Sequence, residues 1–212
     1  MIHAFIFDIG NVLLRFDFSR ALTRLRAHCD PGAEAVLEDW EPIKIAYESG
    51  KIGREEFQKQ VKQALRYTGE APEFVSAWQE IFQENKPMTE LVRKLHGRYP
   101  LYLLSNTSDL HMDYIFATYP ELFGMFSGAV YSHIARCVKP EPEIFQTAIR
   151  ELRVEPTETV FIDDLTPNVE AASRLGFRAI QYNPDDHTAL LAALAREGVE
   201  TSDDSARDVG LT

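Results

Sequence analysis

Five short apolar segments, most of them separated by helix-like stretches, constrain the fold of this chain more than any other feature. Each is four to six residues long and stops at polar or turn-forming residues. The segments span residues 2–7, 101–104, 128–131, 159–162 and 177–182. Helix-like patterns lie between most of them, at 88–97, 108–119, 142–152 and 167–175. Strands that alternate with helices in this way predict an α/β fold, in which helices cover both faces of a Rossmann-like parallel sheet.

Residues 18–86 interrupt this alternation. They contain helix-prone stretches at 19–28, 33–40 and 54–67 and no convincing strand. An insertion of this length predicts a small helical cap domain over the carboxyl ends of the strands, although extra helices on one sheet face are an alternative. The expected division is a sheet core at 1–17 and 87–200, a helical insertion at 18–86 and a flexible tail at 201–212.

Charge and cysteine usage limit the classes of partner. The chain carries 22 lysine and arginine residues against 33 acidic ones, a formal charge of −11. With no local basic stripe, this balance argues against nucleic-acid and membrane binding. Cys29 and Cys137 provide neither a disulfide framework nor a metal-thiolate spacing, and no signal segment opens the chain. We expect a cytoplasmic protein, a monomer or a weak homodimer, with a small-molecule substrate.

Polar residues follow the first two strands of the predicted sheet. Asp8 follows the first strand, so its carboxylate is expected at the carboxyl edge of the sheet, where open α/β sheets bind ligands. Ser105 and Asn106 follow the second strand and open a helix. Their hydroxyl and amide groups suit the binding of an oxyanion, while an ordinary helix cap is the alternative.

Charged residues follow the third and fourth strands of the predicted sheet. Lys139 stands before a proline-stiffened helix start, where it either neutralises phosphate or is a solvated surface lysine. Asp163 and Asp164 end the fourth strand, and adjacent buried carboxylates favour a divalent cation, unless Asp164 caps the next helix. Parallel strands bring all these groups to one edge. A carboxylate nucleophile, a metal site, a hydroxyl and a lysine together indicate phosphoryl transfer through an aspartyl-phosphate.

The sequence resembles the haloacid dehalogenase-like hydrolase superfamily, whose four motifs appear here in order and cover almost the whole chain. They are Asp8, then Ser105 with Asn106, then Lys139, then Asp163 with Asp164. The insertion after the first motif corresponds to the helical cap of that family. Residues 47–52, with Glu56 and Phe57 after them, look like the cap of its bacterial sugar phosphatases, particularly those similar to α-D-glucose-1-phosphate phosphatase. The resemblance implies a Mg²⁺-dependent phosphomonoesterase for a small sugar phosphate, with a sugar 1-phosphate as one candidate.

The resemblance also implies a role for each motif residue. Asp8 would attack phosphorus, and Ser105 and Lys139 would hold the transferring group. Asn106 would orient either that group or the nucleophile. The implied Mg²⁺ ligands are Asp8, the Gly10 carbonyl, Asp164 and, directly or through water, Asp163. Asn168 would support the metal loop or be an ordinary first-turn residue. Trp40, Tyr47, Glu48 and Phe57 are the cap residues expected to line the substrate site, with Glu48 as a substrate-binding candidate.

The first motif departs from the common Asp-x-Asp form of the family, because the chain reads Asp8-Ile9-Gly10. The missing aspartate normally protonates the leaving group and then activates water. General acid–base assistance of this kind raises the reaction rate about 10²- to 10⁴-fold. Its loss favours substrates whose leaving group needs little protonation. Asp17, Glu48 and His111 are the candidates to replace it.

Two other functions remain open from the sequence. A metal-independent 2-haloacid dehalogenase also places an aspartate first, but such enzymes usually follow it with an aromatic residue and Gly-Thr, whereas this chain has Gly10-Asn11-Val12. A non-catalytic member that binds a phosphorylated ligand is suggested by the loss of the second aspartate. The nucleophile, the lysine and the acidic pair argue against it.

Overall fold

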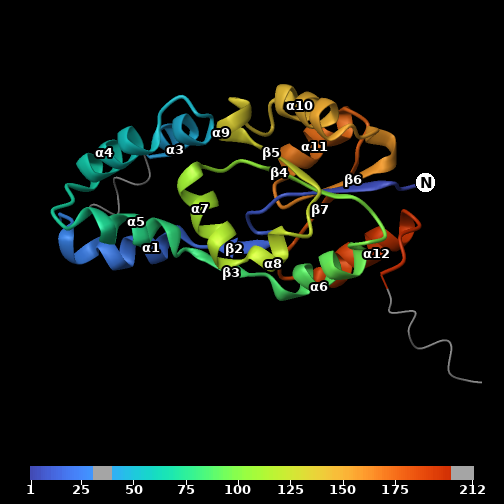
Figure 1. Cartoon of the computed structure of the whole chain (residues 1–212), viewed down its shortest axis with the longest axis horizontal. Helices are drawn as coiled ribbons and strands as arrows, with labels where there is room; N and C mark the ends of the chain where they lie inside the picture. The colour runs from blue at the N-terminus through green and yellow to red at the C-terminus, as the bar shows by residue number, and fades with distance from the viewer. Residues whose placement is uncertain (31–39, 202–212) are drawn as a thin grey trace, which may run out of the picture.

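A five-stranded parallel sheet forms the centre of one lobe of the molecule (Figure 1). The computed structural model describes residues 1–30 and 40–201. The strand order is β5-β4-β1-β6-β7, and every neighbouring pair is parallel. The strands are β1 (Ala4–Phe7), β4 (Leu101–Ser105), β5 (Gly128–Tyr131), β6 (Thr159–Asp163) and β7 (Arg178–Gln181). The predicted α/β class and all five predicted strand positions are confirmed.

Side chains of β1 alternate between the two faces of the sheet. Phe5 and Phe7 belong to one buried cluster with residues of α6 and α12, and Ile6 belongs to a second with residues of α10 and α11. Figure 1 shows α10 and α11 on one side of the sheet and α6 and α12 on the other. These helices span α6 (Lys86–Leu95), α10 (Pro142–Leu152), α11 (Thr166–Arg174) and α12 (His187–Arg196). Because both faces are covered, β1 is buried along its whole length.

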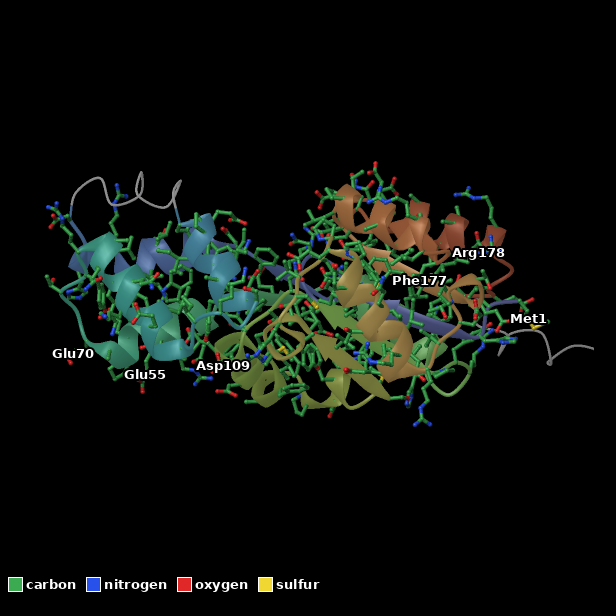
Figure 2. The ribbon with its side chains drawn as sticks, turned by 90° about the horizontal axis from the view of Figure 1, so that it is seen from above. Met1, Glu55, Glu70, Asp109, Phe177 and Arg178 are labelled. Carbon is green, nitrogen blue, oxygen red and sulfur yellow. The ribbon has the colours of Figure 1, made fainter. Side chains whose placement is uncertain are left out.

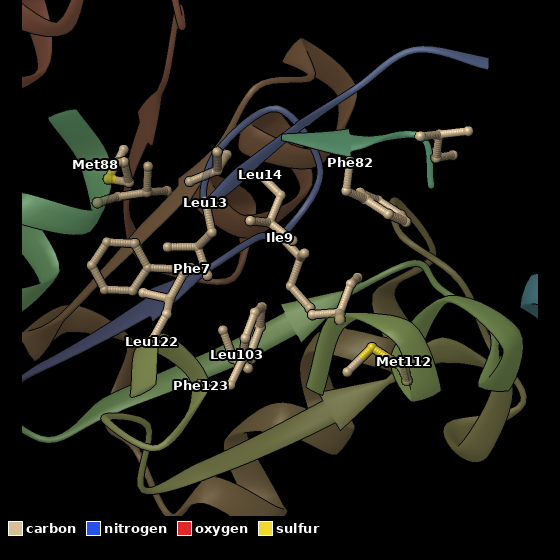
Figure 3. Close-up of a cluster of buried hydrophobic side chains, with 14 of the residues drawn as sticks. Phe7, Ile9, Leu13, Leu14, Phe82, Met88, Leu103, Met112, Leu122 and Phe123 are labelled. Atoms are coloured by element: carbon tan, nitrogen blue, oxygen red, sulfur yellow. The ribbon is translucent and has the colours of Figure 1, made fainter. Parts of the chain in front are cut away.

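The segment directly after β1 turns back into the core. Ile9, Leu13 and Leu14 are buried in the same cluster as Phe7 and Leu103 (Figure 3). The turn is closed by backbone hydrogen bonds from Leu13 and Leu14 to the Ile9 carbonyl, at 3.0 and 2.9 Å. This packing fixes the backbone that follows Asp8.

Shorter elements complete the sheet lobe. The segment after β4 forms α7 (Asp109–Thr118) and α8 (Pro120–Phe123), and α9 (Ser132–Ala135) follows β5. A 3₁₀ turn, η3 (Pro156–Glu158), precedes β6. In the described part of the chain, no helix combines the length and apolarity that a membrane crossing requires.

Helices between β2 and β3 form a second lobe at one end of the molecule (Figure 1). In its described residues this helical lobe contains α1 (Phe18–Leu25), α3 (Glu41–Glu48), α4 (Arg54–Leu65) and α5 (Ala71–Gln79), with the 3₁₀ turn η1 (Arg26–His28) after α1. Trp78 is buried at its centre, with its ring 5.2 Å from Trp40 and 5.8 Å from Phe57 between centroids. The predicted helical stretch at 33–40 falls almost wholly outside the described residues, as does the predicted tail beyond residue 201.

A small antiparallel ribbon joins the two lobes. Strand β2 (Leu14–Phe16) pairs with β3 (Phe82–Glu84), so that Phe16 lies opposite Phe82. The expectation that residues 18–86 contain no strand was therefore wrong at the end of this segment. A strand of three residues has no measurable alternation of its own, and it forms here because β2 offers it a partner.

Candidate active site

Lys139 lies between two carboxylates at the carboxyl edge of the sheet. Its Nζ is 2.9 Å from Oδ1 of Asp8, which follows β1, and 2.6 Å from Oδ2 of Asp163, which ends β6. The Lys139 side chain is 1% exposed, and those of Asp8 and Asp163 are 10% and 0% exposed. Residues from three parts of the chain thus form one buried ion-paired group, as the parallel topology predicted.

Neighbouring groups hold Lys139 in this position. Its Nζ also donates to the Leu104 carbonyl at 2.9 Å. The Asn106 side chain accepts from the Lys139 backbone N–H at 2.8 Å and donates to the Lys139 carbonyl at 2.9 Å. Asn106 was predicted to orient substrate or nucleophile, but both ends of its amide are engaged with this loop. Ser105 is buried at the end of β4, where its side chain lowers the pKa of Asp8 and so favours the carboxylate.

The two aspartates at the end of β6 have different surroundings. The second oxygen of Asp163, Oδ1, accepts from the Leu165 N–H and from the Asn168 amide, each at 2.9 Å. Asn168 therefore supports this loop. Asp164 is less buried and accepts one hydrogen bond from the Asn11 amide at 3.1 Å. Asp163 is occupied on both oxygens, whereas Asp164 retains acceptor capacity.

The three carboxylates fit a divalent cation. One oxygen from each of Asp8, Asp163 and Asp164 lies within 4.8 Å of the others. Burial, and also the nearby Asp163, raise the pKa of Asp8 to about 6 in spite of Lys139. Burial also raises the pKa of Asp164. A bound cation would stabilise the ionised form of these buried carboxylates. Carboxylate oxygens are also the ligands that suit Mg²⁺.

A cavity of about 300 Å³ opens over these groups. Asp8, Lys139 and Asp164 line it from the sheet lobe, and Lys44 and Glu48 line it from α3 of the helical lobe. Its apolar lining residues are Ile9, Phe16, Phe18, Ile81, Phe82, Ile115 and Leu165. Uncharged polar groups and one histidine also line it; they are Asn11, Ser105, Asn106, Thr107, Asn168 and His111. The cavity thus has a charged floor, a wall of apolar and polar side chains, and two ionisable groups from the helical lobe.

Gly10 and Phe16 meet at the floor of this cavity. A Cβ atom at Gly10 would lie 2.8 Å from Cε1 of Phe16, closer than real Cβ atoms approach other heavy atoms. The Phe16 ring is itself held by Phe18, with centroids 5.3 Å apart, and by Phe82, at 6.4 Å. The place where the side chain of a second motif-one aspartate would begin is therefore filled by an aromatic ring.

Of the four cap residues expected to line the substrate site, one does so. Glu48 lines the 300 Å³ cavity, whereas Trp40, Tyr47 and Phe57 surround a separate space of about 10 Å³, too small for a substrate. Those three rings pack the helical lobe instead. Lys44 was missed, although it lies one helical turn before Glu48 and hence on the same face of α3.

The other two acid–base candidates have structural roles. Asp17 is exposed and caps α1 by accepting from the Ser19 N–H at 2.9 Å, which lowers its pKa. His111 lines the cavity, but its ring packs 5.1 Å from that of Phe82 and 6.3 Å from that of Phe18. Burial lowers the pKa of His111 to about 4, so its imidazole is neutral at pH 7.

Polar contacts fasten the end of α3 to the sheet lobe. The Tyr47 hydroxyl hydrogen-bonds to the carboxylate of Asp109 and accepts from the Leu110 N–H at 3.3 Å. Arg54, at the start of α4, donates to the other oxygen of Asp109 at 3.0 Å. Figure 2 shows Asp109 where the two lobes meet. We call these contacts between Tyr47, Arg54 and Asp109 the lobe clasp; they hold α3 over the cavity.

With this fold and site established, comparison with known proteins identifies the class. The chain belongs to the haloacid dehalogenase-like hydrolase family, whose profile matches residues 2–176. It is 29% identical over 189 residues to a D-ribitol-5-phosphate phosphatase of Bacteroides thetaiotaomicron, covering 85% of this chain and 92% of the relative. It is 26% identical over 177 residues to a sesquiterpene phosphatase of Aspergillus oryzae, covering 82% and 86%.

Solved structures agree with this assignment. A haloacid dehalogenase family enzyme of Bacteroides thetaiotaomicron superposes with a TM-score of 0.79 at 25% identity, covering 89% of this chain and 98% of that one. A second crystal structure of that enzyme, in complex with magnesium and inorganic phosphate, gives a TM-score of 0.78 at 23% identity, covering 99% and 100%. The similarity extends over both lobes.

Proposed function

We propose that this chain is a Mg²⁺-dependent phosphomonoesterase that acts through an aspartyl-phosphate on a small sugar or polyol phosphate. The observation that carries the proposal is the position of Lys139, which pairs with Asp8 at 2.9 Å on the floor of a 300 Å³ cavity. A lysine beside a carboxylate nucleophile can neutralise the oxygens of a phosphoryl group that the nucleophile attacks. In this proposal, Ser105 donates a hydrogen bond to the same group.

The acidic cluster would hold the metal. Asp8 and Asp164, with the Gly10 carbonyl, are the proposed ligands, and Asp163 contributes by fixing Lys139 and the loop that carries Asp164. Bound there, Mg²⁺ would stabilise the negative charge that builds on the phosphoryl oxygens. Asp8 attacks phosphorus, the bond to the substrate oxygen breaks, and water later hydrolyses the aspartyl-phosphate.

The helical lobe is proposed to act as the cap that selects the organic part of the substrate. Glu48 and Lys44 give the cavity hydrogen-bonding groups opposite the charged floor, which suits a substrate with hydroxyl groups. The relative that acts on D-ribitol 5-phosphate supports a polyol or sugar phosphate. A polyol phosphate has an alkyl leaving group, so a sugar 1-phosphate is a second candidate rather than a requirement. A cytoplasmic monomer or weak homodimer remains our expectation.

A phosphate-release screen tests this proposal. Polyol phosphates, sugar phosphates and sugar 1-phosphates are assayed with Mg²⁺ and with EDTA, for the wild type and for Asp8→Asn. We expect release from at least one of these classes, dependent on Mg²⁺ and lost in Asp8→Asn. Release of halide from a 2-haloacid in EDTA would instead favour the dehalogenase alternative. Binding of phosphorylated metabolites without turnover would favour the non-catalytic one.

A further inference from the structure

Hydrolysis through an aspartyl-phosphate needs proton transfer twice, once to the leaving-group oxygen and once from the attacking water. In the common form of the first motif, a second aspartate carries out these proton transfers. In this chain that position is Gly10, and the Phe16 ring occupies the space where the aspartate side chain would begin. The ring is held by Phe18 and Phe82 and forms part of the cavity wall. The proton must therefore come from another side chain that reaches the cavity.

Among the described residues that line the cavity, three carry carboxylates: Asp8, Glu48 and Asp164. Asp8 is the nucleophile, and Asp164 belongs to the acidic cluster. His111 lies against two aromatic rings and is neutral at pH 7, so it has no readily donated acidic proton. Asp17 is exposed, is absent from the lining of this cavity and is engaged as a helix cap. Glu48 is left as the carboxyl group that can act on the leaving-group side.

Neighbours on both sides fix the position of Glu48. Tyr47, the preceding residue, is part of the lobe clasp with Asp109. Two residues later, Gly50 lies so close to the sheet lobe that a Cβ there would be 2.3 Å from the His133 carbonyl oxygen. The end of α3 is thus held against the sheet lobe on each side of Glu48. Fixed placement of this kind is what an acid–base group requires.

We propose that Glu48 is the acid–base residue of this enzyme, in place of the aspartate that Gly10 replaces; the proposal rests on the phosphatase function proposed above. As Asp8 attacks, the bond between phosphorus and the leaving-group oxygen breaks, and that oxygen takes the proton of the Glu48 carboxyl. The Glu48 carboxylate then takes a proton from water, whose oxygen attacks the phosphorus of the aspartyl-phosphate. The bond from phosphorus to Asp8 breaks, its electron pair returns to the Asp8 carboxylate, and Glu48 is protonated again.

The charges around Glu48 suit both steps. Burial raises the pKa of Glu48 to about 7, so both protonation states are populated at neutral pH. The charged groups that act on it are Lys44 and Glu41 from α3, and Asp8 and Lys139 from the sheet lobe. The two lysines favour the carboxylate, and the two acidic groups favour the protonated form.

Two substrates with different leaving groups test the role. p-Nitrophenolate leaves without protonation, whereas the alkoxide of an alkyl phosphate such as ribitol 5-phosphate needs a proton. For Glu48→Gln we expect a burst of about one p-nitrophenolate per enzyme, followed by turnover slowed about 10²- to 10⁴-fold, because only the hydrolysis of the aspartyl-phosphate is impaired. With the alkyl phosphate, kcat should fall to a similar extent, with no burst. Beryllium fluoride binding in the presence of Mg²⁺ reports that the site of this variant is intact.

Glu55→Gln is the matched control. Glu55 is an exposed glutamate of α4, and in Figure 2 it lies on the outside of the helical lobe. This variant should behave as the wild type on both substrates. If Glu48→Gln keeps kcat and only raises KM for the alkyl phosphate, Glu48 binds substrate and the acid–base role is overturned. Loss of the first turnover with p-nitrophenyl phosphate would also overturn it. Full activity of Asp8→Asn would overturn the phosphatase mechanism itself, and the Glu48 role with it.

Discussion

The sheet lobe and the helical lobe contribute to the same cavity in different ways. The sheet lobe supplies Asp8 and the acidic pair from the ends of β1 and β6, and Lys139 from the connection between α9 and α10. The helical lobe supplies Glu48 and Lys44 from one helix, placed there by the lobe clasp. The groups proposed to react thus belong to the sheet lobe, and the groups proposed to meet the leaving group belong to the helical lobe. Substitutions in the two lobes should accordingly have different signatures.

The largest effect is expected for Lys139→Met. Removal of the ammonium leaves Asp8 and Asp163 buried without their shared cation, which should cost about 3–5 kcal/mol of folding free energy. Activity should fall by about 10³-fold or more, since phosphoryl oxygens lose their buried positive charge. Chemical denaturation and phosphate release measure the two effects. Lys59→Met, at an exposed position of α4, is the control and should change neither.

Gly10→Asp should lower activity rather than improve it. The new side chain would displace the Phe16 ring, which should cost about 1–3 kcal/mol, and would add a carboxylate to an acidic cluster. Adding Phe16→Ala provides space, so the double variant should be more active than Gly10→Asp alone. Gly53→Asp is the control, because no atom lies within 4 Å of a Cβ at that glycine. Faster hydrolysis of alkyl phosphates by Gly10→Asp alone would show that Phe16 does not close this position.

Arg54→Ala should weaken the lobe clasp and affect catalysis more than stability. Arg54 pairs with both Asp109 and Asp113, and both pairs are partly exposed, so the loss of each should cost at most about 1 kcal/mol of folding free energy. A shift of α3 would displace Glu48, and kcat/KM for an alkyl phosphate should fall about tenfold. Steady-state kinetics and thermal unfolding separate the two effects. Arg66→Ala, which breaks the exposed pair with Asp30, should leave both unchanged.

The smallest expected effect is the contribution of His111 to the loss of folding stability at acidic pH. Because burial lowers the pKa of His111 to about 4 from 6.5, the unfolded chain takes up a proton that the folded chain does not between these pH values. The stabilisation is present above pH 6.5 and is lost as the pH falls. Between pH 7 and 5.5 the wild type should lose about 1 kcal/mol more folding free energy than His111→Gln. Equal losses, measured by urea denaturation at each pH, would mean that the folded-state pKa of His111 is not lowered.

The same comparison explains which features were predictable from the sequence. Asp8 and Asp164 were predictable because strand ends of a parallel sheet share one edge, whichever helices surround them. Lys139 was predictable because the connection that carries it follows β5 and starts from the same edge. The cap residues were not, because Trp40 and Glu48 are both compatible with an amphipathic helix and only tertiary packing decides which faces the cavity. Strand β3 was missed because its three residues depend on β2 for pairing. The role of Phe16 was hidden for a similar reason, since its contact with Gly10 arises from the turn between them.

The central claim is that Asp8 carries the phosphoryl group during turnover. The most direct measurement is rapid acid quenching of the enzyme with an alkyl phosphate and Mg²⁺, followed by peptide mass spectrometry. We predict phosphorylation at Asp8, reversed by hydroxylamine, as expected for an acyl phosphate, and increased in Glu48→Gln supplied with p-nitrophenyl phosphate. An active enzyme that shows no modification at Asp8 under any of these conditions, or phosphorylation at another residue, would contradict this account.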